Sequence, residues 1–198
     1  MRVIAGEAKG RPLKAVPGAN TRPTTDKVKE AIFSMVGPYF EGGLALDLFA
    51  GTGGLGIEAI SRGMKRGIFI DLDRQSIEVI RRNVEAAGMT DRAEIYKNEA
   101  GRALKLLAKR ELAFDLVFLD PPYKMKEADK LMAEMAERGL LADGAVIVVE
   151  HDARHAYGEQ FGAFRQRRQA LYGDIAVTIY DFVQHMPQET TGGTTDEG

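Results

Sequence analysis

The 198-residue chain contains no cysteine, which excludes disulfides, a thiolate nucleophile and a cysteine-ligated zinc site. It also lacks any apolar run near the roughly 20 residues that a membrane-spanning helix requires. Charged side chains at Arg2, Glu7 and Lys9 leave no room for the apolar region of a secretory signal. The three histidines have no spacing typical of a metal site. We therefore expect a cytoplasmic protein that holds no metal and does not enter a membrane.

Net charge is also small, at −2, and its distribution is more informative than its sum. Residues 1–29 hold seven basic and two acidic side chains, a local excess of +5. A second basic cluster lies at 165–168, whereas the last twelve residues hold three acids and no base. A basic N-terminal segment on an otherwise acidic chain favours contact with phosphate groups, although an ordinary solvated hairpin has the same composition.

Length and a hydrophobic content of 44% suit one domain with a sizeable core. Residues 1–16 alternate apolar and polar side chains around two glycines, which predicts a β-hairpin. We divide the chain into a basic hairpin arm at 1–22, one α/β domain at 23–184 and a disordered acidic tail at 185–198.

Strands and helices alternate through the domain, as in a doubly wound α/β sheet. The predicted strands are 44–49, 67–70, 93–97, 116–119 and 145–150, and the predicted helices between them are 57–62, 74–87, 101–110 and 126–138. An earlier helix begins near Thr24 or Thr25. Segments 164–172 and 175–183 flank a Gly-Asp turn and predict a final antiparallel hairpin. The expected fold is a seven-stranded, mostly parallel, Rossmann-like sheet with one reversed strand.

A glycine-rich loop at 50–56 follows the first strand and precedes a helix, an order that lets the backbone approach a nucleotide-like ligand closely. Its glycines also satisfy the dinucleotide pattern G-x-G-x-x-G, so this motif alone is ambiguous. Asp47 can contact an ammonium group or order the loop. Asp71, at the end of the next strand, can accept hydrogen bonds from both ribose hydroxyls of an adenosine. Glu99 can contact an adenine amine or serve as an acid at the start of a helix.

The sequence Asp120-Pro-Pro-Tyr123 ends the fourth strand of the expected sheet. Prolines have no N–H to donate, so the chain must leave the sheet there on a stiff turn. Ligands of open α/β sheets bind beyond the carboxyl ends of the strands. Acceptors on Asp120 and on the Pro121 carbonyl would make the exocyclic amine of a base more pyramidal and more nucleophilic, and Tyr123 would stack on its ring. This combination favours a catalytic site over a chance Pro-Pro turn.

As a set, these motifs resemble class I S-adenosylmethionine-dependent methyltransferases that act on exocyclic amines. The segments that carry a narrower resemblance are 2–6, 10–13, 21–26, 30–33, 46–51 and 58–63. Together they resemble the bacterial 16S rRNA guanine-N2 methyltransferases of the RsmD type, over about residues 1 to 183.

The resemblance implies that S-adenosylmethionine donates a methyl group to a guanine extruded from its stack in 16S rRNA, in free RNA, the small subunit or an assembly intermediate. The implied cofactor contacts are Asp47, Phe49, Ala50, Gly51, Thr52, Gly53, Asp71, Leu72, Glu99 and Ala100. The implied catalytic residues are Asp120, Pro121, Pro122 and Tyr123. The implied RNA contacts are Arg2, Lys9, Arg11, Lys14, Arg22 and Thr24. Many relatives of the wider class carry Asp where this chain has Glu99. We also expect a monomer.

Several alternatives stay open. A nicotinamide-dependent oxidoreductase would explain G-x-G-x-x-G and Asp71, but leaves Asp120-Pro-Pro-Tyr123 unexplained. A non-enzymatic RNA-binding protein would have no chemical reason to keep both Asp120 and the glycine loop. Among methyl acceptors, DNA adenine, another RNA base, a protein glutamine and small amines all fit the motif.

Overall fold

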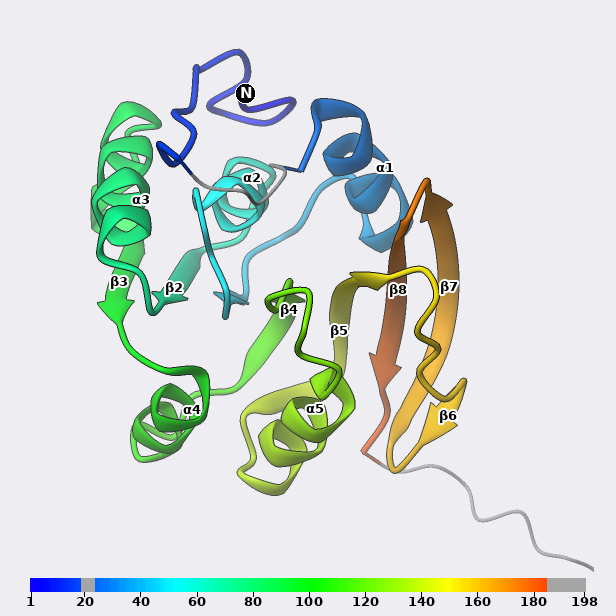
Figure 1. Cartoon of the computed structure of the whole chain (residues 1–198). Coiled ribbons are helices and arrows are strands. Elements are labelled where there is room, and N and C mark those ends of the chain that lie inside the picture. The colour runs from blue at the N-terminus through cyan, green and yellow to red at the C-terminus, as the bar shows by residue number, and fades with distance from the viewer. Residues whose placement is uncertain (19–23, 185–198) are drawn as a thin grey trace, which may run out of the picture.

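The computed structural model describes residues 1–18 and 24–184, so Arg22 and the tail expected at 185–198 lie outside it. Its described residues form one sheet of eight strands, in the order β3-β2-β1-β4-β5-β8-β7-β6 (Figure 1). Five of these strands are parallel: β1 (Leu44–Asp47), β2 (Arg66–Asp71), β3 (Ala93–Lys97), β4 (Phe114–Leu119) and β5 (Leu141–Asp152). The predicted α/β class and mostly parallel sheet are confirmed.

The predicted number of strands is wrong, because seven were expected and eight are present in the described chain. β8 (Ile175–Phe182) runs antiparallel to β5, and β7 (Phe164–Tyr172) antiparallel to β8. The extra strand, β6 (Gln160–Phe161), pairs antiparallel with β7, so both β8 and β6 oppose the parallel strands. Two residues are too few to show the alternation from which a strand is predicted.

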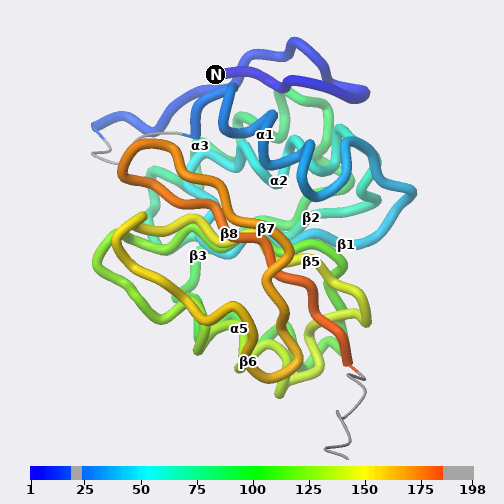
Figure 2. The backbone as a smooth tube through the Cα atoms, turned by 90° about the vertical axis from the view of Figure 1, so that its right-hand side faces the viewer, coloured from blue at the N-terminus to red at the C-terminus, as the bar shows by residue number. Residues whose placement is uncertain are grey.

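Five helices cover the two faces of the sheet in the described residues (Figures 1 and 2). One face is covered by α1 (Asp26–Val36), α2 (Gly54–Ser61) and α3 (Arg74–Ala86), and the other by α4 (Ala100–Ala108) and α5 (Ala128–Glu137). Thr25 is the N-cap of α1, since its hydroxyl accepts a hydrogen bond from the Val28 N–H. Within the described chain, no helix has the length and apolar character needed to cross a bilayer.

The N-terminal arm folds back on itself as the predicted hairpin, although turns and extended segments replace regular strands. Backbone hydrogen bonds join the Val3 N–H to the Arg11 carbonyl and the Leu13 N–H to the Met1 carbonyl, both at 2.9 Å. One isolated antiparallel bridge joins Arg2 to Pro12. Val3, Ala8 and Leu13 are buried in a cluster with side chains of α2 and α3. The arm therefore takes its core from the helices beneath it. Figure 2 shows it lying across the helical layer, on the side away from the sheet.

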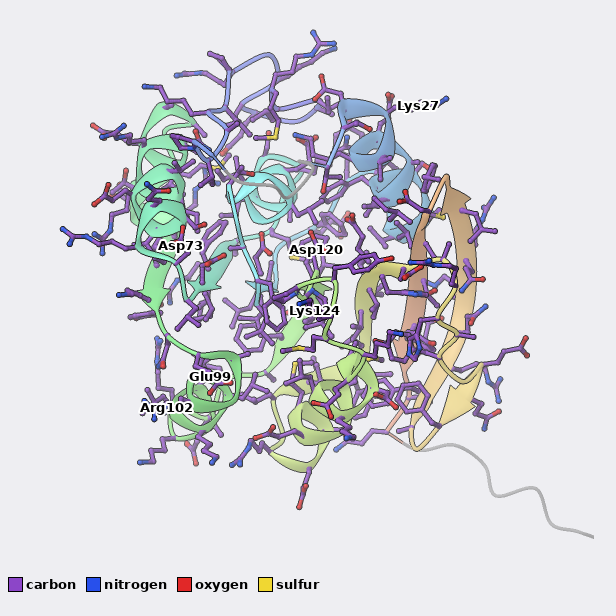
Figure 3. All side chains as sticks on the ribbon, in the orientation of Figure 1. Lys27, Asp73, Glu99, Arg102, Asp120 and Lys124 are labelled. Atoms are coloured by element: carbon purple, nitrogen blue, oxygen red, sulfur yellow. The ribbon has the colours of Figure 1, made fainter. Side chains whose placement is uncertain are left out.

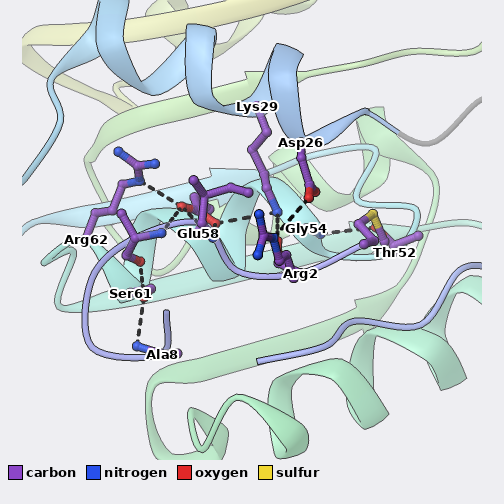
Figure 4. Close-up of polar contacts among 12 residues, drawn as sticks. Arg2, Ala8, Asp26, Lys29, Thr52, Gly54, Glu58, Ser61 and Arg62 are labelled. Carbon is purple, nitrogen blue, oxygen red and sulfur yellow. Dashed lines mark hydrogen bonds and ion pairs between the residues drawn. The ribbon is translucent and has the colours of Figure 1, made fainter. Parts of the chain in front are cut away.

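A buried ion-pair network fixes the arm to α1 and α2 (Figure 4). The fully buried Glu58 carboxylate accepts hydrogen bonds from the backbone N–H groups of residues 4–5. It also pairs with the Arg62 guanidinium at 2.8 Å and the Lys29 ammonium at 3.5 Å. Lys29 donates to the Arg2 carbonyl at 2.5 Å, and burial lowers the pKa of its amine. Lys29 is one of the seven basic residues of segment 1–29, and the structure places it in the interior.

Candidate active site

A cleft of about 1020 Å³ lies along the carboxyl ends of the five parallel strands. The predicted site residues that line it are Thr24, Asp47, Phe49, Ala50, Gly51, Thr52, Asp71, Leu72, Glu99, Ala100, Asp120, Pro121, Pro122 and Tyr123. Figure 3 labels Asp120 just after β4, with Asp73 and Glu99 to one side at the starts of α3 and α4. The cleft thus joins the glycine loop to the Pro-Pro turn, which are far apart in the sequence.

The glycine loop between β1 and α2 is held to the end of β2. Gly51 and Gly53 have φ values of +57° and +78°, in the left-handed region that favours glycine. The Gly51 N–H donates to the Asp71 carboxylate at 2.8 Å, and the other Asp71 oxygen accepts from the Asp73 N–H at 2.9 Å. Gly53 faces inward, because a Cβ there would lie 3.3 Å from Ile80. Asp71 therefore sets the shape of the loop as well as facing the cleft.

Asp47 and Gly56 join β1 to the first turn of α2. The Gly56 N–H donates to the Asp47 carboxylate at 3.1 Å, and burial raises the pKa of Asp47 to about 8. A Cβ at position 56 would lie 2.4 Å from the Phe69 ring, so glycine there allows close packing of helix on strand. The sequence suggested that Asp47 either contacts an ammonium group or orders the loop. The hydrogen bond from Gly56 is a contact of the second kind.

Glu99 is the N-cap of α4. Its two carboxylate oxygens accept hydrogen bonds from the Gly101 and Arg102 N–H groups at 2.9 and 3.0 Å. These bonds lower the pKa of Glu99. The helix-start role is therefore present, and the contact between Glu99 and an adenine amine stays a prediction.

Asp120 and Tyr123 flank the turn at the end of β4. Burial, followed by the nearby carboxylates of Glu150 and Asp47, raises the pKa of Asp120 well above its usual range. The Tyr123 side chain is 60% exposed at the rim of the cleft. Arg154 donates to the Tyr123 hydroxyl, and its guanidinium lies 6.0 Å from the centre of the ring. The turn thus presents a partly buried acid beside an accessible aromatic ring.

The end of β5 and the loop after it contribute residues that were not predicted as part of the site. Glu150, His151, Asp152, His155 and Tyr157 all line the cleft. The His155 and Tyr157 rings are 4.4 Å apart, centre to centre. Within the described part of the chain, no three His, Asp or Glu side chains come together as potential metal ligands. Sequence could have indicated these residues only through their position at the end of a fifth parallel strand, because no motif marks them.

Of the predicted RNA contacts that the structure describes, Thr24 lines the cleft, and Arg2, Lys9, Arg11 and Lys14 do not. Lys9 and Lys14 are exposed on the arm. Arg11 donates to the Ala86 carbonyl at 3.0 Å, and Arg2 pairs with Asp26 at 3.3 Å. Two of the basic side chains therefore help to hold the arm, while the two lysines extend from it.

Comparisons with known proteins agree with the motifs. The family described as Conserved hypothetical protein 95 matches residues 1–181. "Putative rRNA methyltransferase YlbH" of Bacillus subtilis is 50% identical over 180 residues, covering 91% of this chain and 98% of that protein. Ribosomal RNA small subunit methyltransferase D of Haemophilus influenzae is 35% identical over 151 residues, covering 76% and 78% of the two chains. A solved structure, "Putative methyltransferase yhhF from Escherichia coli", has a TM-score of 0.78 and 30% identity, covering 93% and 99%. The resemblance to RsmD-type methyltransferases is thereby confirmed, and the chain belongs to the Conserved hypothetical protein 95 family.

Proposed function

We propose that this protein is an S-adenosylmethionine-dependent methyltransferase that modifies the N2 amine of a guanine in small-subunit rRNA. One cleft contains both the glycine loop and Asp120-Pro-Pro-Tyr123, and this arrangement carries the proposal. The names of the relatives support methyl transfer to rRNA. The choice of guanine N2 is finer than those names, and rests on the RsmD-type resemblance and on the acidic turn.

The residues of the cleft fit S-adenosylmethionine. Each Asp71 oxygen accepts one backbone N–H, which leaves half of the roughly four acceptor sites of a carboxylate for ribose hydroxyls. Leu72, which is 65% exposed, offers an apolar surface for adenine beside Glu99 and Ala100. The loop at 49–53 and Asp47 would hold the methionine part. The cleft is also at the large end of ligand sites, which span roughly 300–1,000 Å³, as expected where a base must enter too.

The Pro-Pro turn would prepare the amine for attack. S-Adenosylmethionine supplies a methyl group that its sulfonium has already activated. The Asp120 carboxylate and the Pro121 carbonyl each accept one N–H of the amine, which frees the nitrogen lone pair. Asp120 would then accept the proton that the amine loses when it is methylated. Its raised pKa suits it to accept that proton, while Tyr123 stacks on the extruded base.

The test is to identify the methylated nucleoside. Purified protein is incubated with S-adenosylmethionine carrying a tritiated methyl group and with 16S rRNA, free or in small subunits, from cells lacking the gene. After digestion to nucleosides, we expect the label in N2-methylguanosine. Label in an adenosine derivative would contradict the choice of base. Absence of label from both RNA preparations would contradict rRNA methylation.

The dependence of kcat/KM on pH in the acidic range should reflect the protonation of Asp120. Asp120 acts as a carboxylate, so kcat/KM falls when pH drops through its pKa. Because burial and the Glu150 and Asp47 carboxylates raise that pKa, we expect the fall well above the pKa near 4 of an ordinary aspartate. Glu150→Gln removes one neighbouring charge and should move the fall to lower pH. The exposed Glu127→Gln is the matched control, and identical profiles for both variants would contradict this electrostatic coupling.

The exposed lysines of the arm should bind the phosphate groups of RNA. Lys9→Glu combined with Lys14→Glu is expected to weaken RNA binding most at low salt, because fewer counterions are released. If both lysines contact phosphates, the slope of log affinity against log salt falls by up to about 2. Lys105→Glu combined with Lys109→Glu makes the same charge change at α4, on the opposite face of the sheet. Equal binding by the two double variants across a salt series would exclude the arm from the RNA interface.

A further inference from the structure

Two carboxylates stand side by side at the end of the sheet, and methyl transfer as described uses one of them. β4 and β5 are parallel neighbours whose register pairs Leu119 with Val149. Asp120 directly follows β4 and Glu150 is the next residue of β5, and the two carboxylates are close enough that Glu150 raises the pKa of Asp120. Both residues line the cleft.

The two acids also project from the same face of the sheet. Phe118 and Val148, two residues earlier on each strand, pack in the core cluster that contains α1. Side chains alternate along a strand, so Asp120 and Glu150 share that face. The Thr24 hydroxyl, just before α1, donates to the Glu150 carboxylate at 3.5 Å. Burial raises the pKa of Glu150, as it does that of Asp120.

A guanine base carries two hydrogen-bond donors that match these two carboxylate acceptors. Its Watson–Crick edge presents two adjacent donors, the N1–H and the N2 amine, whereas adenine presents an acceptor at N1. Given the proposed function, Asp120 accepts from the N2 amine. We infer that Glu150 accepts the N1–H of the same guanine, so that the Asp120–Glu150 pair selects guanine at the active site. A ring nitrogen acceptor in that position would face the Glu150 carboxylate without a proton between them, which disfavours adenine.

Substrate analogues isolate this contact. 2-Aminopurine keeps the amine at C2 but has an acceptor at N1. Splinted ligation places guanine or 2-aminopurine at the mapped position of 16S rRNA. Wild-type protein should prefer guanine in kcat/KM by about 10- to 100-fold, the range for one hydrogen bond to a charged acceptor. In Glu150→Ala the rate with guanine should fall and the rate with 2-aminopurine should not, which removes most of the preference.

Comparing preferences between proteins cancels the intrinsic difference in reactivity of the two amines. The exposed Glu127→Ala should keep the wild-type preference, and all variants should bind S-adenosylhomocysteine alike. If Glu150→Ala slows both substrates equally, or methylates guanine normally, the inference is wrong. If Glu150→Ala does not fold, Glu150→Gln is measured instead. Its neutral acceptor should retain only part of the preference for guanine over 2-aminopurine. An unchanged preference in Glu150→Gln would overturn the inference. Wild-type protein that methylates no guanine would instead overturn the proposed function.

Discussion

Asp120→Ala is expected to lower methyl transfer to small-subunit rRNA by about 10²- to 10³-fold, the usual effect of removing one preorganised polar group from an active site. The variant loses both the acceptor for the amine and the group that receives its proton. Asp120 is not among the residues assigned to the cofactor, so affinity for S-adenosylhomocysteine should change little. Single-turnover methylation and calorimetric binding measure the two effects separately.

Asp120→Asn separates the two roles of the side chain. Its amide oxygen can accept a hydrogen bond from the amine but cannot take up the proton, so we expect activity between those of wild type and Asp120→Ala. The rate of Asp120→Asn should also lose the dependence on pH assigned to Asp120. Near-normal turnover by Asp120→Ala would remove this residue from the mechanism.

Glu58→Ala is expected to lower the free energy of unfolding by about 3 to 5 kcal/mol, the cost of breaking a buried ion pair. Removing the carboxylate leaves Lys29 and Arg62 buried without their counter-charge. It also leaves the N–H groups of residues 4–5 without the acceptor that holds the arm. Urea unfolding at neutral pH measures the change.

An exposed pair provides the control for Glu58. Glu78 lies 3.5 Å from Arg74 on α3, and Glu78→Ala should cost less than about 1 kcal/mol. Adding Lys29→Met to Glu58→Ala should recover part of the loss, because an apolar side chain replaces the unpaired ammonium. If Glu58→Ala unfolds no more easily than Glu78→Ala, the network does not stabilise the arm.

The elements predicted best were those with a clear side-chain period. β3 and β7 have the predicted bounds, and the carboxyl ends of β1, β2 and β4 meet at the cleft because parallel strands share one edge. β5 begins at residue 141, earlier than predicted, because Asp143-Gly144 is typical of a turn and conceals the strand that passes through it.

The features that were missed depend on contacts between distant segments. Lys29 on α1 and Glu58 on α2 are ordinary charged residues in the sequence, and they are buried as an ion pair because the arm packs against both helices. Glu150 carries no motif, and only the register of β4 on β5 brings it beside Asp120. Patterns within one segment do not contain such pairings.

A crystal structure of the protein with S-adenosylhomocysteine tests the central arrangement most directly. We expect the ribose hydroxyls on Asp71 and the sulfur directed toward Asp120, with open space between Asp120 and Tyr123 for a base. A ligand bound away from the glycine loop, or a sulfur directed away from Asp120, would contradict methyl transfer at this turn.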